Sequence, residues 1–112
     1  MKKTEKKGDL TGKALKAKDL VGYDKGAVVS RTIIAKVTGT VTIFSFDKGQ
    51  GLSEHTAPFD AMVEILDGEA EVSIAGNPQK VKAGEFIIMP ANKPHALKAV
   101  KKFKMALIMI KS

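Results

Sequence analysis

The chain has 112 residues, of which 44% are hydrophobic and 28% charged, with a net charge of +7 and no cysteine. This composition is typical of one globular domain, and it excludes disulfides, thiolate metal sites and cysteine nucleophiles. Because the sequence has neither an apolar run of membrane-spanning length nor an apolar stretch behind its basic start, we expect a cytoplasmic protein rather than a membrane or secreted one.

The positive charge is concentrated at the start of the chain. Residues 1–18 contain seven lysines against Glu5 and Asp9, whereas the rest of the chain is close to neutral. Residues 1–9 are polar and without pattern, which predicts a flexible basic tail before a single domain of residues 10–112. Since no stacking aromatic motif or recognition helix accompanies the lysines, we expect no specific binding of nucleic acid.

From residue 26 onward, short apolar or alternating runs are separated by turn residues, the pattern of an all-β sandwich or barrel. Residues 10–24 allow either a short edge strand or a turn of helix. Strands are expected over residues 27–36, 40–46, 61–66, 69–74, 85–89, 95–100 and 103–110. Asp67-Gly68 favours a tight hairpin, because both residues tolerate a positive φ. Met62, Met89, Met105 and Met109 alternate with aliphatic residues and are expected to fill the core.

Two segments resemble the conserved motifs of the cupin superfamily. In residues 49–68, Gly49 is followed after five residues by His55, and Gly68 closes the motif. In residues 84–99, Gly84 is followed after five residues by Pro90, and His95 stands where the family has its histidine. The resemblance implies an antiparallel double-stranded β-helix, the jelly-roll or cupin barrel, with a pocket inside it.

The chain departs from these motifs at four positions. The second histidine, the glutamate, the second-motif glycine and the closing asparagine of the family are here Ala57, Ala61, Asn92 and Ala99. Of the four ligands that cupins usually offer a metal, only His55 and His95 therefore remain. Strand alternation places Ala57 on the face of His55, and Ala61 on the face of Val63. If that face points into the barrel, as in the family, the five residues His55, Ala57, Ala61, Val63 and His95 line a roomy, mostly apolar ligand pocket.

Three interpretations of the two histidines stay open. They could hold a divalent metal such as Zn, Ni, Fe or Mn, although such sites usually have three or four protein ligands and Asp60 is expected to point to the opposite face. They could instead bind the polar group of a mostly apolar guest, or exchange protons with it. They could also be ordinary histidines bonded to the backbone.

The function favoured by this pattern is binding of a small molecule inside the barrel. The alternative is an enzyme of the isomerase, lyase or decarboxylase type, because membership of the family would not by itself select a reaction. The small size of the domain and the resemblance also indicate a homodimer, formed through packed sheets or an exchanged N-terminal strand.

Overall fold

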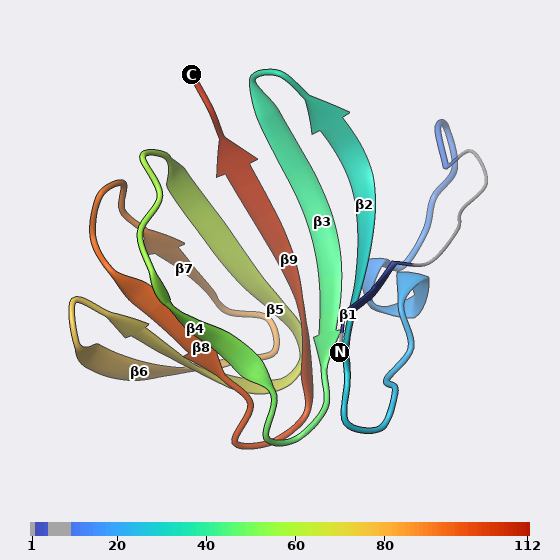
Figure 1. Cartoon of the computed structure of the whole chain (residues 1–112). Helices are drawn as coiled ribbons and strands as arrows, with labels where there is room; N and C mark the ends of the chain where they lie inside the picture. The colour runs from blue at the N-terminus through green and yellow to red at the C-terminus, as the bar shows by residue number, and fades with distance from the viewer. Residues whose placement is uncertain (1, 5–9) are drawn as a thin grey trace.

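The computed structural model describes residues 2–4 and 10–112 and confirms the all-β class. Its elements are β1 (Lys2–Thr4), the 3-10 turn η1 (Ala17–Leu20), β2 (Val28–Lys36), β3 (Gly39–Phe46), β4 (Gly51–His55), β5 (Asp60–Ile74), β6 (Asn77–Lys82), β7 (Phe86–Met89), β8 (His95–Lys98) and β9 (Phe103–Ile110). They form one strongly curled sheet in the order β1-β2-β3-β9-β5-β8-β4, with β6 and β7 also paired to β5 (Figure 1). All neighbours are antiparallel except β1 and β2.

Strand β5 belongs to both halves of the barrel, and the hairpin expected at Asp67-Gly68 is wrong. The first part of β5 pairs with β7 and β9, and residues 69–74 pair with β6. At the junction the register with β9 shifts between Ile65 and Asp67, so the strand bulges instead of turning back. Gly68 has φ 75, and a Cβ there would lie 2.2 Å from the carbonyl oxygen of Lys102. Glycine is thus required for a bend and a close backbone approach, not for a turn.

Strands β4 and β6 were absent from the sequence prediction. Four of the five residues of β4 and five of the six residues of β6 are exposed, so neither segment shows the alternation that marks a half-buried strand. Of the expected N-terminal tail, Lys2–Thr4 form β1, and residues 1 and 5–9 lie outside the described residues. Of the two structures that residues 10–24 allowed, the chain forms the turn of helix, η1.

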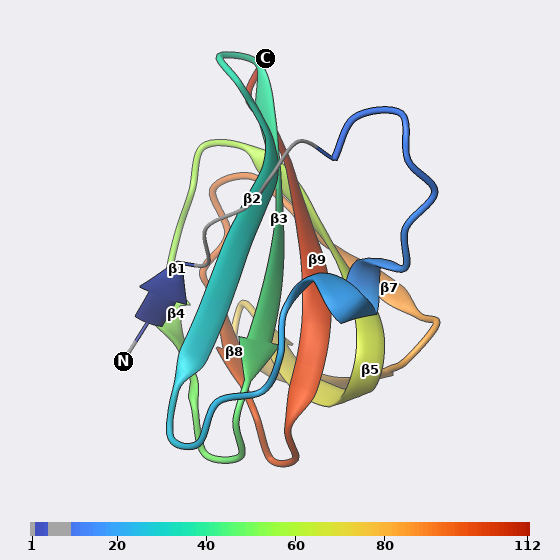
Figure 2. The same ribbon diagram turned by 90° about the vertical axis from the view of Figure 1, so that its right-hand side faces the viewer.

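Residues 10–26, which we call the N-terminal strap, pack on the outer face of the sheet. Figure 2 shows η1 lying across β9 and β5 on that side. Val21 is buried against Ile43 and Ala106, with Leu20 beside them. This small second core anchors the strap by removing its few apolar side chains from water.

Polar contacts fix the strap in place. The Tyr23 hydroxyl donates to Asp67 Oδ2 at 2.5 Å, and the Ser45 hydroxyl donates to the carbonyl of Gly22 at 2.8 Å. Burial, followed by the hydrogen bond and the charge of Asp67, raises the pKa of Tyr23. The phenol therefore remains a proton donor throughout the neutral range.

No helix in the described part of the chain has the length and hydropathy to cross a bilayer.

Candidate functional site

The two histidines meet across the barrel although 40 positions separate them in the chain. Strands β4 and β8 run antiparallel, and their register places His55 opposite His95 after a shift that follows Leu52. The two Nε2 atoms are 3.1 Å apart, and the ring centroids are 4.4 Å apart at an interplanar angle of 73°. His95 is 3% exposed, whereas His55 is exposed. One ring thus reaches into the protein and the other faces the solvent.

The other ring nitrogens fix the tautomers. Nδ1 of His55 lies 2.7 Å from the carbonyl oxygen of Ser53, and Nδ1 of His95 lies 3.1 Å from that of Lys93. A carbonyl oxygen only accepts, so each Nδ1 must carry a hydrogen and donate it. In neutral rings both Nε2 atoms are then bare acceptors that face each other. A single proton between them converts this unfavourable contact into a charge-assisted hydrogen bond.

The surroundings of His95 oppose a second proton on the pair. Burial is the largest cause that lowers the pKa of His95, and the nearby charge of His55 lowers it further, against the smaller opposite effect of the Lys93 carbonyl. The ring of His55 is exposed to water, whereas that of His95 is buried. A positive charge on the His95 ring is therefore disfavoured.

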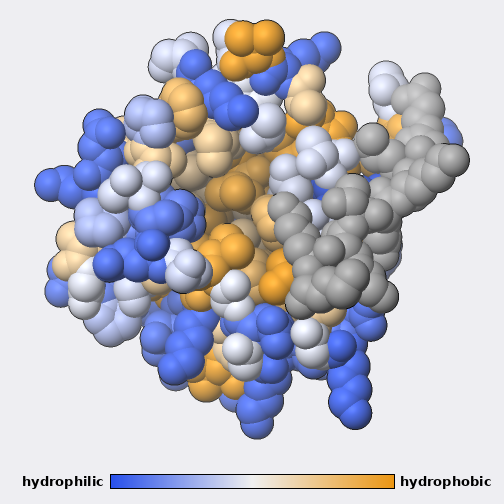
Figure 3. Space-filling view, viewed as in Figure 1, coloured by the Kyte–Doolittle hydropathy of each residue, from blue (hydrophilic) through white to orange (hydrophobic). Residues whose placement is uncertain are grey.

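Beside the imidazoles lies a cavity of about 100 Å³ between the two halves of the barrel. Its wall consists of Leu52, His55, Ala57, Ala61, Met89, His95, Leu97, Met105, Leu107 and Met109. Among the residues described, only the two histidines bring titratable groups to this wall. Figure 3 shows apolar residues gathered in a hollow at the centre of this face of the molecule. The arrangement is a small apolar chamber with one polar corner.

The cavity brings together four of the five residues that the sequence placed in a pocket. His55, Ala57, Ala61 and His95 are in its wall. Val63 is not: it is fully buried, two residues further along β5, in the hydrophobic core cluster. Alternation gave the correct face of the strand for Val63 but could not say where along that face the void ends.

Sequence analysis missed the rest of the wall for two reasons. Leu52 lies on β4, a strand that was not predicted. The methionines Met89, Met105 and Met109 were interpreted as core filler, and they do pack inside, but at the edge of a void. Ala61 pairs with both Met89 and Met109 across the sheet, which places these two methionines beside the alanine that leaves the void. This neighbourhood can be recognised only when the strand register is known.

Asp60 has a different role from that of a site ligand. Its Oδ1 accepts a hydrogen bond from the backbone N–H of Ala91 at 2.8 Å. In the same turn, the Asn92 N–H donates to the carbonyl of Ala57 at 2.8 Å, and Asn92 has φ 65. Asparagine tolerates this left-handed conformation, so it can replace the glycine of the motif. Together these bonds hold the turn before β8 and thereby position His95.

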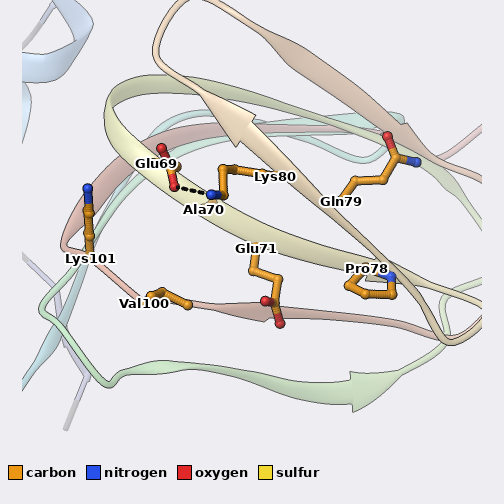
Figure 4. A pocket seen from close by; sticks show the side chains of 8 residues that line it. All are labelled: Glu69, Ala70, Glu71, Pro78, Gln79, Lys80, Val100 and Lys101. Atoms are coloured by element: carbon orange, nitrogen blue, oxygen red, sulfur yellow. Dashed lines mark ion pairs between the residues drawn. The ribbon is translucent and has the colours of Figure 1, made fainter.

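A larger hollow of about 450 Å³ lies on the outer surface over β5 and β6 (Figure 4). Glu69 and Lys80 form an ion pair there at 3.4 Å, and Glu71 and Lys101 complete its charged side chains. The two acids and two bases balance in charge and line an outer surface. These side chains do not combine into a site that would select a ligand of one charge. The inner cavity therefore remains the candidate site.

Comparison with known proteins decides the family. Residues 42–111 match the family model described as a cupin domain. The chain belongs to the cupin family. No curated protein matches it. A conserved protein of unknown function from Streptococcus pyogenes is 39% identical, with a TM-score of 0.88 over 94% of this chain and 93% of that one.

Two other solved cupins extend the comparison. A cupin 2 conserved barrel domain protein from Leptotrichia buccalis is 45% identical over 84% of this chain, with a TM-score of 0.82, and this match spans 46% of that longer chain. A cupin superfamily protein from Desulfitobacterium hafniense is 24% identical over 96% of this chain and 100% of that one, with a TM-score of 0.87, and shares the fold. The cupin barrel is thus confirmed, whereas none of these names assigns a ligand.

The residues of this cupin do not fit a resident metal centre. Such centres normally have three or four protein ligands. Within the described residues there is no group of three or more His, Cys, Asp or Glu side chains that could hold a metal ion. Ala57 and Ala61, at two positions where the family has ligands, present only methyl groups to the cavity. With two donors, His55 and His95 are short of the set that Zn, Ni, Fe or Mn requires.

Proposed function

We propose that this cupin binds a short, mostly apolar carboxylic acid in the cavity between the two halves of its barrel. The observation that carries the proposal is the 3.1 Å approach of two Nε2 atoms whose Nδ1 atoms both face carbonyl oxygens. This pair gains from one added proton and then carries one positive charge. A carboxylate guest would balance that charge and bring no second polar group into an apolar wall.

The size of the cavity supports a small guest. A volume of about 100 Å³ equals that of three or four water molecules at about 30 Å³ each. A short aliphatic chain fits this space, whereas a nucleotide or another large ring system does not. Three methionines in the wall, Met89, Met105 and Met109, offer flexible side chains that adapt to the shape of an apolar guest.

Calorimetry with butyrate and its neutral relative butyramide tests the proposal. Butyrate should bind with uptake of one proton near pH 7.5, so the measured heat should change with the ionisation enthalpy of the buffer. His55→Ala should weaken this binding about tenfold to a hundredfold, the value of a hydrogen bond to a charged group. His55 is exposed, so the variant should fold. Lys98→Ala, an exposed residue at the end of β8, is the control and should bind as the wild type does.

The possible outcomes separate the parts of the proposal. Equal affinity for butyrate and butyramide would contradict the acid preference but leave an apolar pocket. Binding that disappears after treatment with a chelator would assign the histidines to a metal instead. If neither probe binds at millimolar concentration, the pocket is not a site for short guests.

A proton-transfer enzyme is the second candidate. Its support is the lowered pKa of His95, which keeps Nε2 in the free-base form beside the cavity at neutral pH. Such a base can take a proton from carbon next to a carbonyl, leave the electron pair as an enolate, and return the proton. With 2-oxobutyrate in D₂O, an enzyme would exchange the hydrogens at C3 and His95→Gln would not. Saturable binding without exchange would identify a binding module.

A further inference from the structure

The inner cavity has an open end and a closed end, and the strand register orders its wall between them. At one end, Ala61 pairs with Met89 on β7 and with Met109 on β9. His95 lies at the same end, because a short turn joins Met89 to the start of β8, and His55 faces His95 from β4. His55 is exposed and Met109 is partly exposed. This end is therefore the mouth of the cavity.

The other end of the cavity is closed by buried apolar side chains. On β8, Leu97 is the next inward residue after His95 and is 3% exposed. On β9, Met105 is fully buried, and both side chains line the cavity. The next inward residue of β9 is Phe103, which is not in the wall and stacks on Phe46 with ring centroids 4.6 Å apart. The cavity thus ends at Leu97 and Met105, which we call its floor.

A guest whose acid group binds the two histidines must point its tail toward the floor. The histidines stand at the mouth and bring the only titratable side chains to the described wall. The rest of the wall includes Leu52 and Leu107, whose side chains neither donate nor accept a hydrogen bond. The carboxylate therefore stays near water, and the alkyl chain fills the interior. Each methylene group buried in this way should tighten binding about fourfold.

We propose a length limit that rests on the proposed function: Met105 restricts the cavity to unbranched, unsubstituted acids with about three or four carbon atoms behind the carboxyl group. A cavity of about 100 Å³ has room for that many carbon atoms if each occupies roughly 30 Å³, the volume of a water molecule. A longer chain must displace Met105. This residue pairs with Phe44 and Ile65, which belong to the core cluster, so its side chain has close-packed neighbours and little space to move into.

Met89 offers a matched comparison, because it has the same side chain at the mouth instead of the floor. Met105→Ala should deepen the cavity below the end of the alkyl chain and admit longer acids. Met89→Ala should widen it beside the carboxylate, next to Ala61, and admit acids branched at C2. Met62 follows Ala61 in the chain and lies on the opposite face of β5, so Met62→Ala is the control and should change neither preference.

Calorimetry with straight-chain acids from propionate to heptanoate tests the limit. In the wild type the dissociation constant should fall about fourfold with each added carbon up to butyrate or pentanoate. It should then rise about tenfold by heptanoate, because the cavity is overfilled. 4-Hydroxybutyrate should bind about tenfold more weakly than butyrate, because leucine and methionine at the floor leave its hydroxyl without a partner.

The variants should move these preferences in different directions. Met105→Ala should bind hexanoate about tenfold more tightly than the wild type does, the gain from burying two further methylene groups. Met89→Ala should keep the wild-type optimum among straight chains and gain about fourfold for 2-methylbutyrate. Thermal unfolding checks that each variant folds. If Met105→Ala does not fold, Met105→Val removes less volume and should shift the optimum in the same direction by about one carbon.

The outcomes separate the length limit from the proposed function. A wild type that binds none of these acids would overturn both. Acid binding that keeps tightening through heptanoate would overturn the limit and leave the acid site in place. So would an optimum that stays at the same chain length in every folded Met105 variant, or one that moves equally in Met89→Ala, because the floor would then lie elsewhere.

Discussion

The two ends of this barrel are built from the same strands but are filled differently. At one end, cross-strand pairing joins Phe46, Phe103 and Gly68. The rings of Phe46 and Phe103 stack with centroids 4.6 Å apart, and both side chains are fully buried. At the other end the same three strands place Met109 between Thr40 and Ala61, and the cavity opens there.

The difference shows how few side chains decide where a site lies. Protein interiors pack densely, so a void persists only where neighbouring side chains are too short to fill it. Ala57 and Ala61 leave that space, and the flexible methionines around them do not close it. We therefore expect substitutions at the aromatic end to change stability and substitutions at the alanine end to change binding.

The largest effect is expected from Phe103→Ala at the packed end. Removing a fully buried aromatic ring should lower the free energy of unfolding by about 3–5 kcal/mol, because the surrounding β-sheet cannot collapse around the gap. Urea denaturation measures the change. The matched substitution Leu107→Ala removes a partly exposed wall residue beside an existing void, so it should cost clearly less. Equal losses at the two sites would remove the distinction between the ends.

A smaller effect separates two alanines on β5. Ala61→Leu should fill the cavity and weaken butyrate binding at least tenfold, while stability changes by less than about 1 kcal/mol because there is space for the side chain. Ala70→Leu adds the same atoms to a 1% exposed position of the core cluster that does not border the inner cavity, and should cost about 1–3 kcal/mol through overpacking. Calorimetry and urea denaturation on both variants give the comparison. Similar losses of unfolding free energy in the Ala61→Leu and Ala70→Leu variants would mean that the cavity end is as tightly filled as the core.

The smallest effect concerns pH and the polar corner of the cavity. The pKa of His95 is lower in the folded chain than its usual value of about 6.5, so below that pH the unfolded state binds more protons. Stability should therefore be full above about pH 6.5 and should fall as the pH drops toward the folded-state pKa. Unfolding temperatures at about pH 7.5 and 5.5 should differ more for the wild type than for His95→Gln. An unchanged difference in the variant would show that His95 is not the group responsible.

Alternation and turn residues were sufficient to predict the all-β class, and the resemblance of the glycine and histidine spacing to the cupin motifs implied the barrel and the meeting of the two histidines. The prediction of secondary structure from the sequence failed in two places, one where a residue pair occurs in more than one kind of structure and one where a strand is almost fully exposed. Asp67-Gly68 has the composition of a hairpin turn but here bends a strand that continues. Strand β6 has one buried residue, Val81, and so shows no alternation.

Other features depend on three-dimensional register and could not be read from the chain. Val63 and Ala61 share a face, yet only Ala61 borders the void. The direction of each imidazole depends on the carbonyls of Ser53, in the part of β4 where the register shifts, and of Lys93, in the turn before β8. Met62 was expected in the core, but it pairs with Ile108 and Ile88, and its neighbour Ala61 faces the inner cavity, so Met62 lies on the outer face of the sheet.

The position of β9 has a consequence for how the protein is made. This strand is the last of the domain in sequence, yet it lies between β3 and β5 in the sheet. While a ribosome is still synthesising the residues before it, β3 and β5 have edges without a neighbour, and such edges attract other chains. The nascent domain can complete its fold only after β9 has emerged, so chains that stop before Phe103 should aggregate during translation instead of forming a smaller barrel.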